Sequence, residues 1–335
     1  MRRRNRWTLV LLAFGGLVTL AFGLAIAGYS YVNYRYETAP DPSATQTVVF
    51  DVPRGSGLSS IADRLETDGL IGNATLFKLV TRMRGNAANF KAGEFALTPG
   101  SSMAKIYDDL ANGRAILYPF TVPEGATSAQ VVRALDRLET LKDDDPSVPP
   151  EGSLLPETYL TPRGMAQSAL LAQMASAQDD LLDELWDARA PDLPFGTREE
   201  AIILASVIEK ETGIGMERDK IAGLFINRLR RGMKLQSDPT IIYGITGGDP
   251  IRRRIRQSEI DRVTDWNTYQ IAGLPRTPIC NPGEAAIRAV LNPAETDALY
   301  FVADGTGGHA FARTLAEHNR NVARWRQIQR ERGLR

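Results

Sequence analysis

The sequence contains little cysteine and little histidine: Cys280, His309 and His318 are the only such residues among 335. No disulfide can form within the chain, and a catalytic cysteine would have only two histidines as partners. Zinc sites need three or four closely spaced ligands, so these two histidines predict no metal site. We expect Cys280 to be a buried filler, the histidines to make structural hydrogen bonds, and the protein to need no cofactor.

The sequence also lacks an excess of charge of either sign. Its 40 basic residues are balanced by 40 acidic ones. A chain that binds nucleic acid generally needs a basic excess to neutralise phosphates, so we expect no nucleic-acid partner. A phosphate-binding motif of the form G-x-x-x-x-G-K-[ST] is also missing, which argues against ATP-dependent chemistry. The apolar content of 43% is enough for a sizeable core.

The N-terminal segment predicts a membrane anchor. Residues 1–6 hold four arginines, whereas residues 7–34 hold no charged side chain. A transmembrane helix needs only about 20 apolar residues. Trp7 at one end and Tyr29, Tyr31 and Tyr34 at the other are typical of the two membrane interfaces. The arginines predict a cytoplasmic tail at residues 1–6, a single span at 7–34 and an exported remainder.

A cleaved signal peptide is the alternative, because Ala25-Ile-Ala27 has the small-x-small form of a cleavage site. The apolar stretch is longer than the ~7–15 residues usual for a signal peptide, which favours the anchor. A mature protein beginning at Gly28 would contradict it. Residues 35–46, rich in Pro, Asp, Ser and Thr, predict a flexible linker.

A weak repeat follows the linker. In each copy a glycine precedes a β-branched residue by six positions, and a leucine follows four later, with strand-like residues before the glycine. The three sets are Gly55, Ile61 and Leu65; Gly100, Ile106 and Leu110; and Gly125, Val131 and Leu135. Each copy predicts a strand, a glycine turn and an amphipathic helix. Residues 47–117 thus resemble a small α+β subdomain of the LysM type, which binds glycans; the alternative is a purely structural domain.

Residues 118–335 predict an α+β catalytic domain. A helical pattern covers 168–189, and Thr197 to Glu200 has the form of a capping box before the apolar run 201–208. A second helix is expected over 217–231. Beyond Lys234 the chain is expected to be rich in loops, with a strand at 298–302 and a basic helix at 314–333.

Glu209 ends the apolar helix and is the leading catalytic candidate. Helical spacing places Ile202, Ala205 and Ser206 on its face, and the two small residues suggest that this face lines a cleft. Burial would raise the pKa of a carboxyl there, as a general acid near neutral pH requires. The alternative is an exposed glutamate paired with a basic residue. Glu211 points elsewhere on the helix, so we expect the helix to offer one inward carboxylate.

Several long motifs resemble the endolytic murein transglycosylase family, also called the MltG or YceG-like family. They occur in order along the chain from Gly152 onward. These motifs are Gly152-Ser-Leu-Leu-Pro-Glu-Thr-Tyr159, Ala205-Ser-Val-Ile-Glu-Lys-Glu-Thr212, Glu217-Arg-Asp-Lys220, Phe225-Ile-Asn-Arg-Leu229, Leu235-Gln-Ser-Asp-Pro-Thr240, Tyr243-Gly244, Tyr269-Gln-Ile-Ala-Gly-Leu-Pro275, Pro278-Ile279, Asn281-Pro-Gly283, Tyr300-Phe-Val-Ala-Asp304, Gly307-Gly-His-Ala-Phe311 and Glu317-His-Asn319.

The resemblance implies that Glu209 is the catalytic residue of a lytic transglycosylase. It would protonate the leaving oxygen of the β-1,4 bond between N-acetylmuramic acid and N-acetylglucosamine. It would then act as base while the sugar's own 6-hydroxyl closes a 1,6-anhydro ring without water. The resemblance further implies glycan strands of peptidoglycan as substrate, the bacterial inner membrane with a periplasmic catalytic domain, peptidoglycan synthases as partners, and a role in ending strand elongation.

Polar and aromatic residues after Lys234 predict the opposite wall of the substrate cleft. Amide, hydroxyl and ring groups suit sugar binding. The candidates are Gln236, Ser237, Asp238, Thr240, Tyr243, Tyr269 and Asn281. Asp238 could instead cap a loop before Pro239, and turn chemistry is the alternative for Tyr269 and Asn281.

Two other functions remain open at this stage. A non-enzymatic, membrane-anchored scaffold would use the repeat to bind peptidoglycan, and a cysteine or metal peptidase is a distant third because its partners are scarce. The arginines at 252–254 and 256 could contact acidic peptide stems, but we expect them to face solvent.

Overall fold

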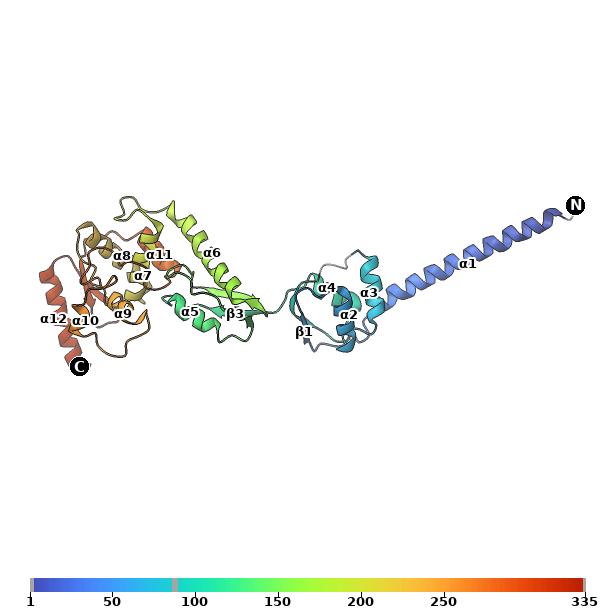
Figure 1. The fold of residues 1–335 in the computed structure, drawn as a ribbon, viewed down its shortest axis with the longest axis horizontal. Helices are drawn as coiled ribbons and strands as arrows, with labels where there is room; N and C mark the ends of the chain where they lie inside the picture. The colour runs from blue at the N-terminus through green and yellow to red at the C-terminus, as the bar shows by residue number, and fades with distance from the viewer. Residues whose placement is uncertain (1–2, 86–89, 334–335) are drawn as a thin grey trace. The chain divides into compact units, whose positions relative to one another are not determined.

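The computed structural model describes residues 3–85 and 90–333, and it is a mixed α+β structure. The contacts divide the chain into two compact units (Figure 1). Unit 1 comprises Met1–Tyr118 with Pro162–Gly164, and unit 2 comprises Pro119–Thr161 and Met165–Arg335. Each unit has its own hydrophobic core, so each is described by itself.

Unit 1 begins with the long helix α1 (Arg3–Glu37), whose segment Trp7–Glu37 is long and apolar enough to cross a membrane. Its large apolar side chains are exposed, as expected of a helix that would face lipid. The helix runs past the predicted end of the span. Tyr36 is fully buried and stacks on Phe77, with ring centroids 6.1 Å apart.

The segment predicted to be a flexible linker is instead packed. Residues 35–37 belong to α1, and the backbone N–H of Asp41 donates to Gly100 O at 3.0 Å. A Cβ on Gly100 would lie 2.9 Å from the Cβ of Asp41, so the two backbones approach closely. The composition resembled a linker, but an aromatic core residue and a glycine contact fix this stretch.

The rest of unit 1 consists of β1 (Val48–Val52), α2 (Leu58–Thr67), α3 (Ala74–Met83), β2 (Gly93–Leu97) and α4 (Met103–Ala111). β1 and β2 pair antiparallel, with Val48 opposite Leu97. The repeat is confirmed as two strand–turn–helix units, because Ile61, Leu65, Ile106 and Leu110 are core residues. α3, which Asn73 caps at Leu76 N, has no counterpart in the repeat.

Unit 2 begins within β3 (Leu117–Thr121), which pairs with β5 (Thr158–Pro162). The third copy of the repeat is present here, with Val131 and Leu135 of α5 (Ser128–Leu135) buried. The short strands β4 (Leu141–Lys142) and β6 (Met165–Ala166) pair in parallel, and α6 (Gln167–Trp186) follows directly. These elements share one hydrophobic cluster.

Three helices form the main core of unit 2: α7 (Arg198–Glu211), α8 (Gly215–Arg230) and α11 (Glu284–Leu291). The capping box at Thr197 and Glu200 is confirmed, and every residue of the apolar run 201–208 is buried. The terminal elements are β7 (Tyr300–Ala303), β8 (His309–Ala312) and α12 (Leu315–Glu331), the last with a capping box at Thr314.

The expectation of a loop-rich region beyond Lys234 was only partly right. Asp238 and Pro239 open the helix α9 (Asp238–Thr246), because proline at the first position of a helix loses no hydrogen bond. Pro282 and Gly283 likewise precede α11, and a short helix, α10 (Gln257–Ile260), lies between. Pro239 and Pro282 were expected to lie in loops, but each lies at or just before the start of a helix.

Candidate functional site

Glu209 lies in the last turn of α7, where the buried part of the helix gives way to loops. Its side chain is only 6% exposed. Ala205 and Ser206, on the same face of the helix, were predicted to line a cleft, but both are fully buried in the core. Ser206 is fully buried, and its hydroxyl accepts a hydrogen bond of 3.0 Å from Ile279 N. The small side chains allow the 279–283 segment to approach α7 and reach the carboxyl of Glu209.

Four residues act on the Glu209 carboxyl: Gly283, Arg218, Glu124 and Lys210. Gly283 N–H donates to Oε2 at 3.0 Å, and an Arg218 Nη2 lies 3.6 Å from Oε1. Burial raises the pKa of Glu209, and the negative charge of Glu124 adds to this. The Gly283 N–H and the charges of Arg218 and Lys210 lower it, but the net direction is upward. A carboxyl of this kind keeps its proton at higher pH than an exposed glutamate.

Glu124 is a second carboxylate at the site, and the sequence had not indicated it. Its Oε2 lies 3.8 Å from the same Arg218 Nη2, and its side chain is 48% exposed. Two oxygens within 4 Å of one nitrogen are less than about 8 Å apart, so the two carboxyl groups are close enough to influence each other's charge. Arg218 itself is 11% exposed, and its buried Nε has no hydrogen-bond partner within the described chain.

Gly283 lies between the two carboxyl groups. A Cβ on this residue would come within 2.1 Å of Glu124 Oε1, whereas its N–H bonds Glu209. Any side chain here would therefore displace Glu124. On the other side, Gly125 has a φ of +76°, and a Cβ there would lie 3.6 Å from Glu209 Cγ. Both glycines allow backbone to approach the Glu209 carboxyl.

Asn281 joins the loops that carry these residues. It is fully buried and bonds the loop after β3 through its backbone, by Asn281 N to Ala126 O at 2.9 Å and Gly125 N to Asn281 O at 3.0 Å. Its side chain accepts from Leu154 N at 3.0 Å and donates to Ala126 O at 3.1 Å. Asn281, which was predicted to bind sugar, thus holds in place the loop that carries Glu124.

The face of α7 opposite Glu209 carries a second acidic group, so the expectation of one inward carboxylate was wrong. Glu211 is partly buried, and burial raises its pKa to about 7. The neighbouring Ser237, His309 and Arg228 lower this pKa, and the charge of Asp238 raises it. Glu209 and Glu211 do point in different directions, as residues two apart on a helix should. Each side chain nevertheless lies against a loop, Glu209 against Gly283 and Glu211 against Ser237.

The 236–240 segment lies beside Glu211. Ser237 and Thr240 are fully buried, and Thr240 is bonded to Ser237 O at 2.6 Å and to Thr268 at 2.9 Å. Asp238 is exposed and accepts from the Tyr269 hydroxyl at 2.7 Å. Gln236 is exposed with a φ of +54°, which is uncommon for a residue with a Cβ.

Tyr243 belongs to a different set of contacts. Its hydroxyl donates to Glu151 Oε2 at 3.2 Å, and its ring meets Trp266 edge-on at 5.6 Å. Glu151 also accepts from Ser128 N at 2.8 Å, and burial raises the pKa of its carboxyl. Tyr243 therefore reaches the Glu124-bearing loop through Glu151 and Ser128.

The remaining candidates have structural partners. His309 Nδ1 lies 2.7 Å from Glu217 Oε2, and His318 stacks on Tyr300 at 5.3 Å. Over residues 3–85 and 90–333, no group of three His, Cys, Asp or Glu side chains could hold a metal ion. Cys280 is buried, and burial raises the pKa of its thiol.

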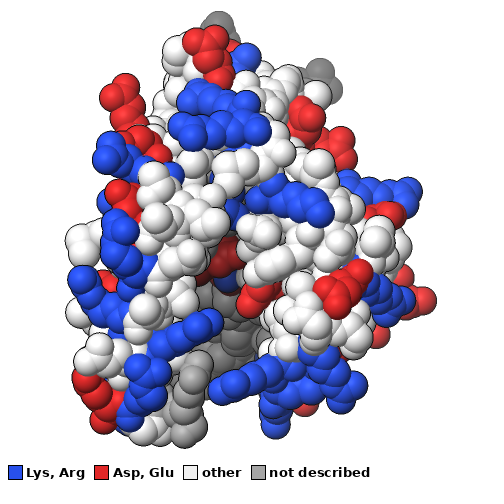
Figure 2. All heavy atoms as spheres, turned by 90° about the vertical axis from the view of Figure 1, so that its left-hand side faces the viewer, with Lys and Arg blue, Asp and Glu red and all other residues white. Residues whose placement is uncertain are grey.

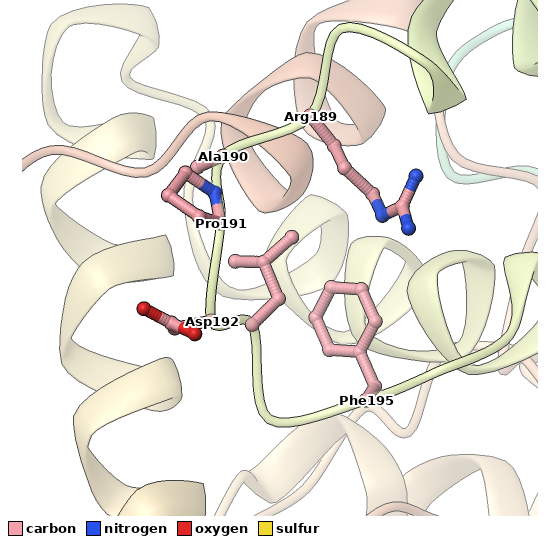
Figure 3. Close-up of a pocket in the computed structure, with 6 residues that line it drawn as sticks. Arg189, Ala190, Pro191, Asp192 and Phe195 are labelled. Carbon is pink, nitrogen blue, oxygen red and sulfur yellow. The ribbon is translucent and has the colours of Figure 1, made fainter.

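The surface near these elements is mixed in charge. The arginines at 252–254 and 256 are exposed, as predicted. Figure 2 shows basic and acidic side chains interspersed around a hollow in this face of the molecule, with an acidic group lying deep within it. A separate cavity of about 360 Å³ is lined by the 189–195 loop, including Arg189, Asp192 and Phe195 (Figure 3). That loop precedes the start of α7, whereas Glu209 lies in the last turn of that helix, and the loop supplies none of the contacts of Glu209 named above.

Comparisons with known proteins agree with the motifs. A model of the YceG-like family matches residues 50–324. A protein of Bacillus subtilis (strain 168) named endolytic murein transglycosylase is 31% identical over 82% of this chain and 83% of its own length. A protein of the same name from Streptococcus pneumoniae (strain D39) is 28% identical over 91% of this chain, which spans 64% of that protein.

A solved structure is also similar. The crystal structure of a yceG-like protein from Listeria monocytogenes has 28% sequence identity and a TM-score of 0.51, covering 83% of this chain and 99% of that one. The family model covers well over half of the residues, and the likeness extends to the fold. The chain belongs to the YceG-like family.

Proposed function

We propose that this protein is a lytic transglycosylase that cuts the glycan strands of peptidoglycan, with Glu209 as its catalytic acid and base. The nearly buried carboxyl of Glu209, with a raised pKa and a single N–H donor from Gly283, carries the proposal. The names of the curated relatives support the same reaction. Glu209 protonates the leaving oxygen and then takes a proton from the sugar's own 6-hydroxyl, leaving a 1,6-anhydro-N-acetylmuramic acid end.

Among the candidate sugar-binding residues, those with exposed side chains are the proposed substrate contacts. Gln236 and Asp238 are exposed and Tyr269 is partly exposed, so their side chains are available to a glycan. Ser237, Thr240 and Asn281 are fully buried and serve as supports for those contacts. Tyr243 is partly exposed and presents its ring rather than its bonded hydroxyl. Sugar rings bind well to such mixed polar and aromatic surfaces.

The proposal assigns a location and a role to each part of the chain. Residues 7–34 form a single span of the bacterial inner membrane, residues 1–6 are cytoplasmic, and the remainder is periplasmic. Residues 47–117 form a LysM-like glycan-binding subdomain, and residues 118–335 form the catalytic domain. The protein ends the elongation of nascent strands in association with peptidoglycan synthases.

Mass analysis of digested, uncrosslinked glycan strands tests the reaction. The full chain should release products lighter by one water than hydrolytic products, and Glu209→Gln should release none while still binding glycan. Absence of cleavage by the unaltered chain would favour the non-enzymatic scaffold.

A two-carboxylate hydrolase is the second candidate, favoured by the position of Glu124 near Glu209. Digestion in ¹⁸O-water separates the two reactions. A hydrolase places ¹⁸O at every new reducing end, whereas an intramolecular ring closure incorporates none. Normal reducing ends carrying the label would replace the lytic mechanism by the hydrolytic one.

A further inference from the structure

α3 is the helix of unit 1 that packs against the end of the proposed span. Phe77 lies within α3, and its ring stacks on Tyr36 of α1. Arg84 follows the last residue of α3, and its Nη2 lies 2.5 Å from Glu37 Oε1 of α1. The Arg84 guanidinium also lies 4.7 Å above the Tyr36 ring. Because α1 is one continuous helix, these contacts fix the height of α3 relative to the span.

That height can be worked out along α1. The part of the helix from Trp7 to Ala27, which ends before the first interfacial tyrosine, is about 31 Å long at 1.5 Å per residue, which matches the ~30 Å hydrocarbon core of a bilayer. Asn33 lies six residues farther, about 9 Å beyond the hydrocarbon. Headgroups occupy roughly the next 5–8 Å. Arg84 Nη2 is 3.5 Å from Asn33 Oδ1, so this end of α3 lies just outside the headgroup layer, within the reach of its side chains.

The outward face of α3 has the composition of a membrane-contacting surface. Leu79 and Met83, one helical turn apart, are 49% and 61% exposed, although they are large and apolar. Arg82 lies on the same side and is exposed. Figure 1 shows α3 at the end of unit 1 from which α1 leaves. Apolar side chains combined with arginines are typical of surfaces that insert shallowly between lipid headgroups.

We propose that the exposed face of α3, formed by Leu79, Arg82 and Met83, rests on the headgroup layer of the membrane that α1 spans. Leu79 and Met83 insert beside the headgroups, and Arg82 binds their phosphates. The contact holds unit 1 against the bilayer in addition to the helix that anchors it. The inference rests on the proposed membrane anchor, from which the height of α3 is measured.

Site-specific fluorescence on the full chain tests this contact. Cys280 is buried, so a Cys280→Ser background leaves a single introduced cysteine for an environment-sensitive dye. Three variants are compared in nanodiscs with anionic phosphatidylglycerol: Met83→Cys, Val49→Cys on the exposed side of β1, and Leu17→Cys within the span. Val49 is 60% exposed, close to the 61% of Met83, but it lies on β1 and not on the proposed contact face of α3.

The dye at Met83 should show a blue-shifted emission and several-fold stronger quenching by headgroup spin labels than the dye at Val49. Replacing phosphatidylglycerol by a zwitterionic lipid should weaken that quenching. Equal, water-like emission at Met83 and Val49 would overturn the inference while the Leu17 dye still reports hydrocarbon. A water-like signal at Leu17 would instead refute the anchor itself, so the two failures are distinguishable.

Discussion

Glu124 and Arg218 shift the pKa of Glu209 in opposite directions, so substitutions at these two residues should have opposite effects on the pH profile of activity. Glu124→Gln removes a negative charge that raises the pKa of Glu209, and Arg218→Gln removes a positive charge that lowers it. In the first variant Glu209 loses its proton at lower pH, so the alkaline limb of kcat/KM moves to lower pH. In the second variant the same limb moves to higher pH. Glu124→Gln is isosteric and Arg218→Gln shortens the side chain, but the two variants should shift the limb in opposite directions, so each serves as the control for the other.

The size of the Glu124 effect follows from Coulomb's law. Their shared contact with Arg218 Nη2 sets an upper limit of about 7 Å on the separation of the two carboxylates, and at that limit two unit charges interact by about 0.6 kcal/mol in water and about 2.4 kcal/mol at an effective dielectric constant of 20. Because the Glu124 side chain is 48% exposed, the lower part of this range applies, about 0.6–1.2 kcal/mol. This corresponds to a loss of about 3- to 8-fold in kcat/KM on the alkaline side. Below the pKa of Glu209 the two enzymes should be equally active.

The assay is release of soluble fragments from uncrosslinked glycan strands by the full chain in detergent, measured across the pH range. A loss that is equal at every pH would refute the electrostatic role, because it would indicate misfolding or poor binding. A loss of several orders of magnitude at every pH would show that Glu124 takes part in the chemistry itself, as in a two-carboxylate hydrolase.

Three further predictions concern support of the site. Glu211 has a folded-state pKa of about 7 against about 4.5 when unfolded, so the unfolded state ionises first and unit 2 loses stability as pH rises from 4.5 to 7. Glu211→Gln should remove this loss, up to about 3 kcal/mol above pH 7, measured by urea unfolding followed through the tryptophans; unchanged stability at pH 8 would contradict it. Asn281→Ala leaves Leu154 N–H unpaired in the core and should cost about 2–4 kcal/mol in the same assay, and a cost below 1 kcal/mol would count against the bracing role. Gly283→Ala should lower kcat/KM about 3- to 8-fold on the alkaline side, as Glu124→Gln does, because its Cβ would displace Glu124, with glycan binding retained; a wild-type pH profile would refute the close approach.

Local features of the sequence predicted the elements of the fold well. The capping box at Thr197 and Glu200 and the apolar run after it act within a few residues, so α7 and the position of Glu209 at its end could be predicted. The repeat predicted Ile61, Leu65 and their counterparts as core residues for the same reason. The core position of Tyr36, within the predicted linker, could not be predicted, because the Pro, Asp, Ser and Thr around it are typical of a linker and its packing partner Phe77 is distant in sequence.

The partners of Glu209 could not be predicted, because they come from distant parts of the chain. Glu124 lies in the turn after β3 and Gly283 just before α11, and nothing in the periodicity relates either to α7. Their approach depends on Asn281, whose side chain and backbone bond the two loops together. Asn281 was identified from its motif and its residue type, and an amide side chain is as suitable for bracing loops as for binding sugar.

The arrangement around Glu209 explains how one carboxyl can serve both steps of the proposed reaction. The residue must hold a proton when substrate arrives, which burial and the charge of Glu124 favour. It must then exist as an anion long enough to accept the proton of the 6-hydroxyl, which the Gly283 N–H and Arg218 favour. With only burial and the charge of Glu124, the carboxyl would be a poor acid. With only the Gly283 N–H and Arg218, it would lose its proton before substrate binds. The opposed influences require Gly283, since only a residue without a side chain can donate to one carboxyl while lying against the other.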